Sequence, residues 1–92
     1  MQIRYTANVS WQSYFGQTYI FNEANGLVYR LEGTAQAFWL ALEQQPCFEQ
    51  VLVQLQTLYP TVLPEQLRQD MTAFAHSLQQ KALVQISQEV QP

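Results

Sequence analysis

The sequence predicts an α+β fold in which a three-stranded antiparallel sheet is followed by three helices. Residues suited to a pleated surface fill much of the segment from residue 9 to residue 32, with turn signals between them. Three stripes of apolar residues at helical spacing follow, up to about residue 82. Because a lone hairpin is marginal in water, the sheet must lie on the helices, which form the second layer of the core. We expect one domain over residues 1–86 and a flexible tail over residues 87–92.

Three strands are predicted in the first third of the chain. The first covers Val9–Phe15, which is rich in aromatic residues, and Gly16 provides the turn after it. The second covers Thr18–Asn22 and the third covers Leu27–Glu32. Asn25-Gly26 lies between them and favours positive φ at both residues, which marks a hairpin.

The register of this second hairpin depends on the length of its loop. A loop of two or four residues places Ile20 on the same face as Tyr29. A loop of three residues places Tyr19 and Phe21 on that face instead. We favour the two-residue loop, in which Asn-Gly alone makes the turn. The third strand has two faces, formed by Leu27, Tyr29 and Leu31 and by Val28, Arg30 and Glu32.

Three helices are predicted from the apolar stripes. The first begins at Thr34, whose hydroxyl suits an N-cap, and it ends before Pro46. The second begins near Cys47, and the third begins at Pro64, a residue that suits the first turn of a helix. After the third helix, weak alternation over Leu83–Ile86 predicts a short extended segment that docks on the domain. The stripes consist of Ala35, Phe38, Trp39 and Leu42, then Phe48, Val51, Leu52, Leu55, Leu58 and Tyr59, then Leu67, Met71, Phe74, Ala75 and Leu78.

The charge of the chain argues against nucleic-acid binding. Only 12% of the residues are charged, against about 25% in an average soluble protein, and the net charge is −3. Proteins that bind DNA or RNA usually carry a basic stripe, because neutralising phosphates drives much of their affinity. The four fixed cations here are scattered along the chain, at Arg4, Arg30, Arg68 and Lys81. We therefore expect no nucleic-acid partner.

Composition also predicts a cytoplasmic protein without a membrane partner. The sequence has no apolar run near the roughly 18 residues that a membrane span requires. The first residues lack the basic and apolar segments of a signal peptide. The single cysteine excludes an internal disulfide and fits a reducing compartment.

No catalytic motif is present, so we expect no enzyme, no catalytic residue, no metal and no cofactor. Cys47 and His76 are the only thiol and the only imidazole, and no local signature links them. Cys47 opens a helix and would feel its dipole, which makes a small thiol enzyme one hypothesis, although a small residue at a helix cap is the simpler interpretation. A metal site requires three or four ligands at set spacing. The carboxylates are dispersed, which argues against a paired acid and base.

The third strand has an edge that the hairpin does not pair. An uncovered edge is an aggregation risk that proteins usually block, and it is also a standard place to add an extended peptide as a further strand. Alternatively, the third helix covers this edge, or the charged Arg30 and Glu32 blunt it. The residues alone leave both interpretations open.

Three ordered runs extend from the third strand towards the end of the chain. They are VYRLEGTAQAFWLAL at residues 28–42, CFEQVLVQLQTLY at 47–59 and PEQLRQDMTAFAHSLQQKALV at 64–84. This series resembles the PqqD-like family of precursor-peptide recognition elements, with its runs VY.LN.TA..IW.LL, TVEEIV..L...Y and PEE...DV..FL..L...GL. The resemblance covers roughly residues 18–86, and it departs from the family at caps and turns, namely at Cys47, Leu63 and Ala82.

The resemblance implies a winged-helix-like, non-enzymatic adaptor. Such domains bind the leader segment of a ribosomally synthesised precursor peptide and present it to a separate maturase or leader peptidase. The leader adds as a strand beside the third strand, in a groove walled by the third helix. The residues expected at this site are the backbone of Leu27, Val28, Tyr29, Arg30 and Leu31 and the side chains of Arg68, Met71, Thr72 and Ala75.

Two arginines of the expected site, Arg30 and Arg68, are candidates to pair with an acidic leader residue. The same strand edge can also pair with a second copy of the chain, which would give a homodimer. The alternative function is a winged-helix regulator that binds DNA. It would need a basic recognition helix, and the third helix carries only Arg68 and Lys81.

Overall fold

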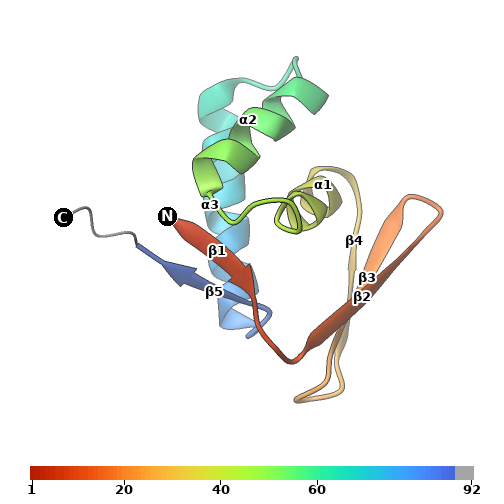
Figure 1. Ribbon diagram of the computed structural model, residues 1–92. Coiled ribbons are helices and arrows are strands. Elements are labelled where there is room, and N and C mark those ends of the chain that lie inside the picture. The colour runs from red at the N-terminus through yellow and green to blue at the C-terminus, as the bar shows by residue number, and fades with distance from the viewer. Residues whose placement is uncertain (89–92) are drawn as a thin grey trace.

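The computed structural model describes residues 1–88 and has the predicted α+β fold (Figure 1). Its elements are, in chain order, β1 (Gln2–Tyr5), β2 (Val9–Tyr14), β3 (Gln17–Asn22), β4 (Val28–Leu31), α1 (Gly33–Ala41), α2 (Phe48–Leu58), α3 (Pro64–Gln80) and β5 (Val84–Ser87). The predicted three-stranded meander is the antiparallel sheet β2-β3-β4. The predicted helices are α1, α2 and α3.

A second sheet, which the sequence did not predict, joins the two ends of the described chain. β1 and β5 pair antiparallel, from Gln2 opposite Ser87 to Tyr5 opposite Val84. The segment expected to dock in an extended form is therefore a strand. Of the tail predicted over residues 87–92, Ser87 belongs to β5, and residues 89–92 lie outside the described residues.

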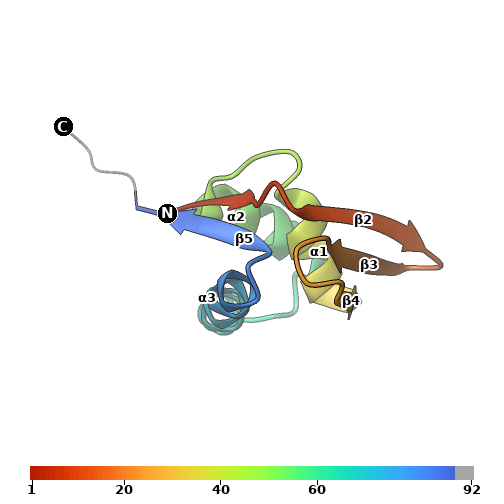
Figure 2. The same cartoon turned by 90° about the horizontal axis from the view of Figure 1, so that it is seen from below.

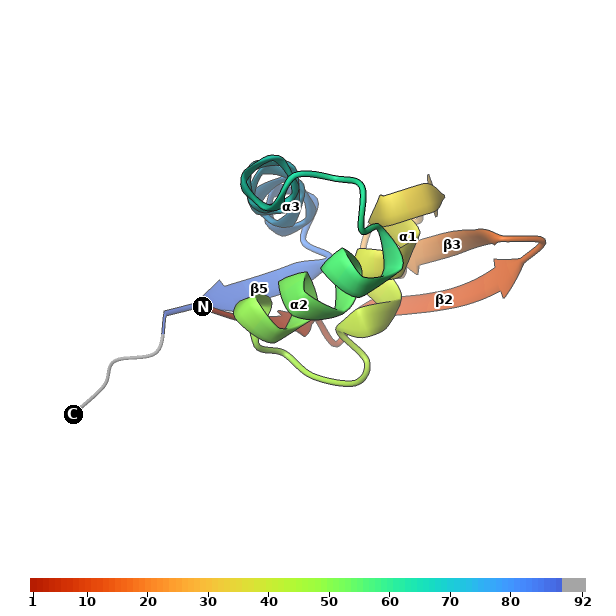
Figure 3. The same cartoon turned by 90° about the horizontal axis from the view of Figure 1, so that it is seen from above.

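The other side of β1 is fastened to the connection between α1 and α2. The Ile3 N–H donates to the carbonyl oxygen of Pro46 at 2.8 Å, and the Phe48 N–H donates to that of Met1 at 3.0 Å. An isolated bridge also pairs Gln2 with Cys47. β1 thus has hydrogen-bonded neighbours on both sides, which makes the N-terminal residues part of the domain. Figure 3 shows the two sheets extending to opposite sides of the helices, with the β2–β3 hairpin projecting outward.

The first hairpin turns where the sequence predicts. Tyr14 lies opposite Gln17, and the two residues between them, Phe15 and Gly16, have φ of 51° and 78°. Positive φ at both loop residues is the geometry of a tight hairpin turn that matches strand twist. The projecting tip is fully exposed at Phe15.

The second hairpin has a four-residue loop, so the predicted two-residue loop was wrong. Ile20 lies opposite Tyr29, which confirms the predicted face. The loop begins earlier than Asn-Gly because Asn22 starts the turn: its carbonyl oxygen accepts from the Gly26 N–H at 2.8 Å, and its side-chain Oδ1 accepts from the Ala24 N–H at 2.9 Å. The sequence pattern cannot distinguish two loop lengths that conserve the same face.

The apolar stripes of the helices pack in one core with Ile3, Ile20, Leu31 and Val84 of the two sheets, although Leu58 of the predicted α2 stripe is exposed. The Phe38 ring is fully buried and meets the rings of Phe48 and Phe74 at centroid distances of 6.2 and 5.7 Å. α3 begins at Pro64 as predicted. The N-cap of α1 is Glu32, so the prediction of a Thr34 cap was wrong, and no side chain caps this helix.

Tyr5 joins the small sheet to the C-terminal end of α1. Its hydroxyl donates to the carbonyl oxygen of Trp39, one of the last carbonyls of the helix, which lack partners within the helix. Its ring lies 4.3 Å from the ring of Trp11 and 4.5 Å from that of Trp39, between centroids. Burial, and then the charge of Glu43, raises the pKa of Tyr5 far above its ordinary value. The phenol therefore stays neutral and able to donate.

Replacing Tyr5 by Phe should lower the free energy of unfolding by about 1 kcal/mol, because it removes this hydrogen bond and keeps the ring. Since the folded state raises the pKa of Tyr5, the neutral phenol stabilises the fold fully below about pH 10, and that contribution is lost as the pH rises further. Urea denaturation at neutral pH and above pH 10 measures both effects. Tyr14→Phe is the matched control, because the Tyr14 side chain is exposed. Equal stability of Tyr5→Phe and wild type at neutral pH would contradict the assignment.

Candidate functional site

The hydrogen bonds of β3 determine which backbone groups of β4 are used. The Glu23 N–H donates to the carbonyl oxygen of Asn8 at 2.8 Å, and the Asn22 N–H donates to that of Leu27 at 2.9 Å. Because hydrogen-bonded pairs alternate along an antiparallel ladder, β3 directs odd-numbered residues to β2 and even-numbered residues to β4. Tyr29 and Leu31 of β4 therefore direct their N–H and C=O groups to β3, and so does the carbonyl of Leu27 just before β4, whose N–H bonds to the Asn25 Oδ1.

The other residues of β4, Val28 and Arg30, direct their N–H and C=O groups away from β3. The sheet order is β2-β3-β4, so no strand among residues 1–88 pairs with this side of β4. Val28 is 59% exposed, and Arg30 is also exposed. Each residue offers one donor and one acceptor to an added strand. In the described part of the chain, this edge is open.

The C-terminal end of α3 lies close to β4. The Lys81 Nζ, just after the helix, is 6.0 Å from the centroid of the Tyr29 ring. Phe74 and Ser77 precede Lys81 by seven and four residues, so they share this flank of the helix. In Figure 2, α3 and β4 lie along the same side of the molecule, below α1. We call Tyr29 of β4 together with Phe74, Ser77 and Lys81 the candidate groove.

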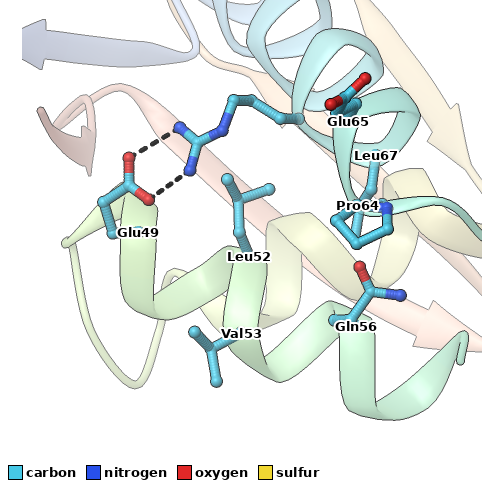
Figure 4. Close-up of a pocket in the computed structure, with 8 residues that line it drawn as sticks. Glu49, Leu52, Val53, Gln56, Pro64, Glu65 and Leu67 are labelled. Atoms are coloured by element: carbon cyan, nitrogen blue, oxygen red, sulfur yellow. Dashed lines mark hydrogen bonds and ion pairs between the residues drawn. The ribbon is translucent and has the colours of Figure 1, made fainter.

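The residues predicted on α3 do not come together with β4. Met71 and Ala75 are buried in the core, at 5% and 0% exposure. Arg68 faces α2, where its guanidinium makes two hydrogen bonds, of 2.7 and 2.6 Å, to the carboxylate of Glu49 (Figure 4). Thr72 lies one turn after Arg68 on that same flank. An apolar stripe identifies the core face of a helix but not which flank adjoins a strand, so the position of Ser77 and Lys81 near β4 could not be predicted from the sequence.

The Glu49–Arg68 pair borders a shallow cavity of about 280 Å³ between α2 and α3 (Figure 4). Hydrogen bonding from Arg68 lowers the pKa of Glu49. Both side chains are more than half exposed, so solvent screens the pair and it contributes little to stability. The pair matters for the candidate site because it holds the Arg68 charge on the α2 side of α3, away from β4.

A buried asparagine fixes the distance between β4 and α3. Asn22 is 1% exposed, and its Oδ1 accepts from the Asn8 Nδ2 at 2.7 Å and from the Ala24 N–H at 2.9 Å. Its Nδ2 donates to the carbonyl oxygen of Lys81 at 3.3 Å. The turn before β4 is therefore tied to the residue that ends α3. From the sequence alone, Asn22 is predicted only as the end of a strand.

The two candidate groups for thiol chemistry lie on different elements. Cys47 is half-buried at the N-cap of α2, and its backbone neighbours β1. His76 is exposed on α3. Within residues 1–88, no group of three or more His, Cys, Asp or Glu side chains is placed to hold a metal ion. No helix in that range has both the length and the apolar character needed to cross a bilayer. What this geometry offers clearly is backbone hydrogen bonding at a strand edge.

Comparison with known proteins gives one family and one fold. The family described as "Coenzyme PQQ synthesis protein D (PqqD)" matches residues 17–84. No curated protein matches the chain. The solved structure of TbiB1 in complex with the TbiA(beta) leader peptide is similar, with a TM-score of 0.86. The alignment covers 94% of this chain and 99% of that chain at 16% sequence identity, so it shows a shared fold.

Replacing Asn22 by Ala should lower the free energy of unfolding by about 1–3 kcal/mol, because buried partners lose their hydrogen bonds. Asn25→Ala is the control. The Asn25 Oδ1 also accepts from a backbone N–H, that of Leu27 at 3.0 Å, but in an exposed turn where water can replace it. Urea denaturation measures both variants. Equal losses would contradict the role of Asn22 as a buried tie.

Proposed function

This chain belongs to the PqqD family, and we propose on that basis that it binds the leader segment of a ribosomally synthesised precursor peptide. The observation that carries the proposal is the open edge of β4, where Val28 and Arg30 direct backbone groups outward. The similar TbiB1 structure, which is a complex with a leader peptide, supports the same function for this fold.

The leader adds as a strand next to β4. Its backbone pairs with Val28 and Arg30, while the three other residues from Leu27 to Leu31 keep β4 attached to β3. Because side chains alternate, every second leader residue points into the groove beside Tyr29, and the others emerge on the outer face of the sheet. Backbone pairing holds the peptide, and the groove reads its side chains.

The wall of the groove is the flank of α3 that carries Phe74, Ser77 and Lys81. This replaces the predicted wall of Arg68 and Thr72, which lie on the opposite flank, and of Met71 and Ala75, which are buried. Asn22 sets the distance between wall and strand through its bond to Lys81.

The protein presents the bound leader to a separate maturase or leader peptidase. The outer face and tip of the β2-β3-β4 sheet expose aromatic rings, with Tyr14 at 53%, Tyr19 at 37%, Phe21 at 39% and Phe15 at 102%. At roughly 150–250 Å² for each ring residue, they expose a few hundred Å², the size of patch that marks functional surfaces. That area is below the ~800 Å² per partner of a stable interface, which fits transient contact with an enzyme.

Replacing Val28 by Pro should weaken leader binding about tenfold with little change in the free energy of unfolding. Proline removes an N–H that points outward and leaves the β3–β4 ladder intact. Val28→Thr is the matched control, because it keeps the N–H and a β-branched side chain. Calorimetric titration with a synthetic leader from the precursor encoded beside this chain measures the affinity, and urea denaturation checks the fold.

Tyr29→Pro provides the opposite case. The Tyr29 N–H bonds to β3, so this change should destabilise the sheet itself. Unchanged leader affinity in a folded Val28→Pro variant would sink the proposed strand addition.

A further inference from the structure

Three of the four fixed cations are held away from the candidate groove. Arg68 is bound to Glu49 on the α2 side. The Arg4 Nη2 donates to the Gln2 Oε1 at 3.2 Å in the small sheet. Arg30 alternates with Tyr29 and therefore directs its side chain to the outer face of β4. The remaining cation is Lys81, and it is the one that lies over the inner face of β4.

The Lys81 ammonium contacts two neutral groups. Its Nζ is 2.7 Å from the Ser77 Oγ and 6.0 Å from the centroid of the Tyr29 ring. In the described part of the chain, the one ion pair is that of Arg68 and Glu49, so Lys81 has no carboxylate within 4 Å. An ammonium has three donors, and the hydroxyl of Ser77 takes one of them.

The nearest carboxylate on this flank of α3 is too far away to neutralise Lys81. Asp70 accepts from the Gln66 Nε2 at 2.8 Å. It precedes Lys81 by eleven residues, which corresponds to about 16 Å along a helix. At that distance, water and salt screen most of the interaction between the two groups. The positive charge therefore belongs to one end of the groove.

Lys81 also has a fixed position relative to a strand added to β4. Its carbonyl oxygen is held by the buried Asn22, and its ammonium group lies over Tyr29. Tyr29 is the residue between Val28 and Arg30, the two residues whose backbone faces the open edge. A peptide residue in register with Tyr29 has its side chain on the same face and so beneath Lys81.

We propose that Lys81, Ser77 and the ring of Tyr29 form a carboxylate-binding subsite, which selects leader peptides with an Asp or Glu in register with Tyr29. This inference rests on the proposed function, since it names the side chain that the groove reads. The Lys81 ammonium donates to the carboxylate, and a charge-assisted hydrogen bond of this kind is about twice as strong as a neutral one. The open edge holds the peptide backbone, and this subsite sets its register.

The test is a double-mutant cycle between Lys81 and the acidic residues of the leader. Lys81→Gln, Lys81→Arg and Arg68→Gln are titrated with the synthetic leader and with variants in which one Asp or Glu is changed to its amide. We expect Lys81→Gln to lose about five- to twentyfold in affinity and Lys81→Arg to lose less than threefold. For the wild-type protein, one amide variant of the leader should lose affinity by the same factor. For Lys81→Gln, that variant should bind as tightly as the unchanged leader.

Arg68→Gln is the matched control for net charge, because it also removes one cation from α3 but on the flank away from β4. Its affinity should stay within twofold of wild type. Lys81 and Arg68 side chains are both exposed, so both variants should remain folded in urea denaturation.

Each failure has a distinct meaning. Wild-type affinity in Lys81→Gln, or losses that add without coupling to any leader residue, would overturn the subsite. Strand addition would then still stand if Val28→Pro weakens binding. A leader that binds but contains no Asp or Glu would likewise overturn the subsite alone. No binding by the wild type would overturn both proposals.

Discussion

The backbone of β4 must divide its hydrogen bonds between two sides, and the site depends on that division. β3 is paired with β2 through one set of residues and with β4 through the other. Alternate residues of β4 therefore bond to β3, and the backbone N–H and C=O groups of Val28 and Arg30 face outward. The small sheet is closed differently, because β1 is bonded to β5 on one side and to the segment around Pro46 on the other. Among residues 1–88, the fold thus covers the edge of β1 and leaves that of β4 open.

The position of α3 gives this edge its chemical character. A buried amide, Asn22, ties the end of α3 to the turn that precedes β4, so the helix flank and the strand edge are fixed relative to each other. The two cations of this region then have opposite surroundings. Arg68 is neutralised by Glu49 on one flank, whereas Lys81 lies over Tyr29 on the other without a carboxylate partner among residues 1–88. Lys81 is therefore the cation that lies on the inner side of β4, over Tyr29.

Local sequence patterns predicted the three helices and the strands of the meander. The features that they could not predict depend on contacts between residues far apart in the sequence. Turn residues and alternation located β2, β3 and β4, and helical stripes located the three helices, because both signals come from neighbours in sequence. The pairing of β1 with β5 joins four-residue strands from opposite ends of the chain, which no local signal reveals. The loop length was wrong because Asn22 starts the turn with its own side chain and carbonyl. Helical spacing separates core from surface but does not identify which flank of α3 lies nearer β4, so the contacts of Arg68 with Glu49 and of Lys81 with Tyr29 could not be predicted.

If the open backbone of β4 receives the leader, amide hydrogen exchange will report it residue by residue. In the free protein, the amides of Tyr29 and Leu31 should exchange slowly and those of Val28 and Arg30 quickly, since only the former bond to β3. Saturating leader peptide should slow Val28 and Arg30 and abolish this alternation. A leader that binds while Val28 and Arg30 keep exchanging as in the free protein would contradict strand addition at β4.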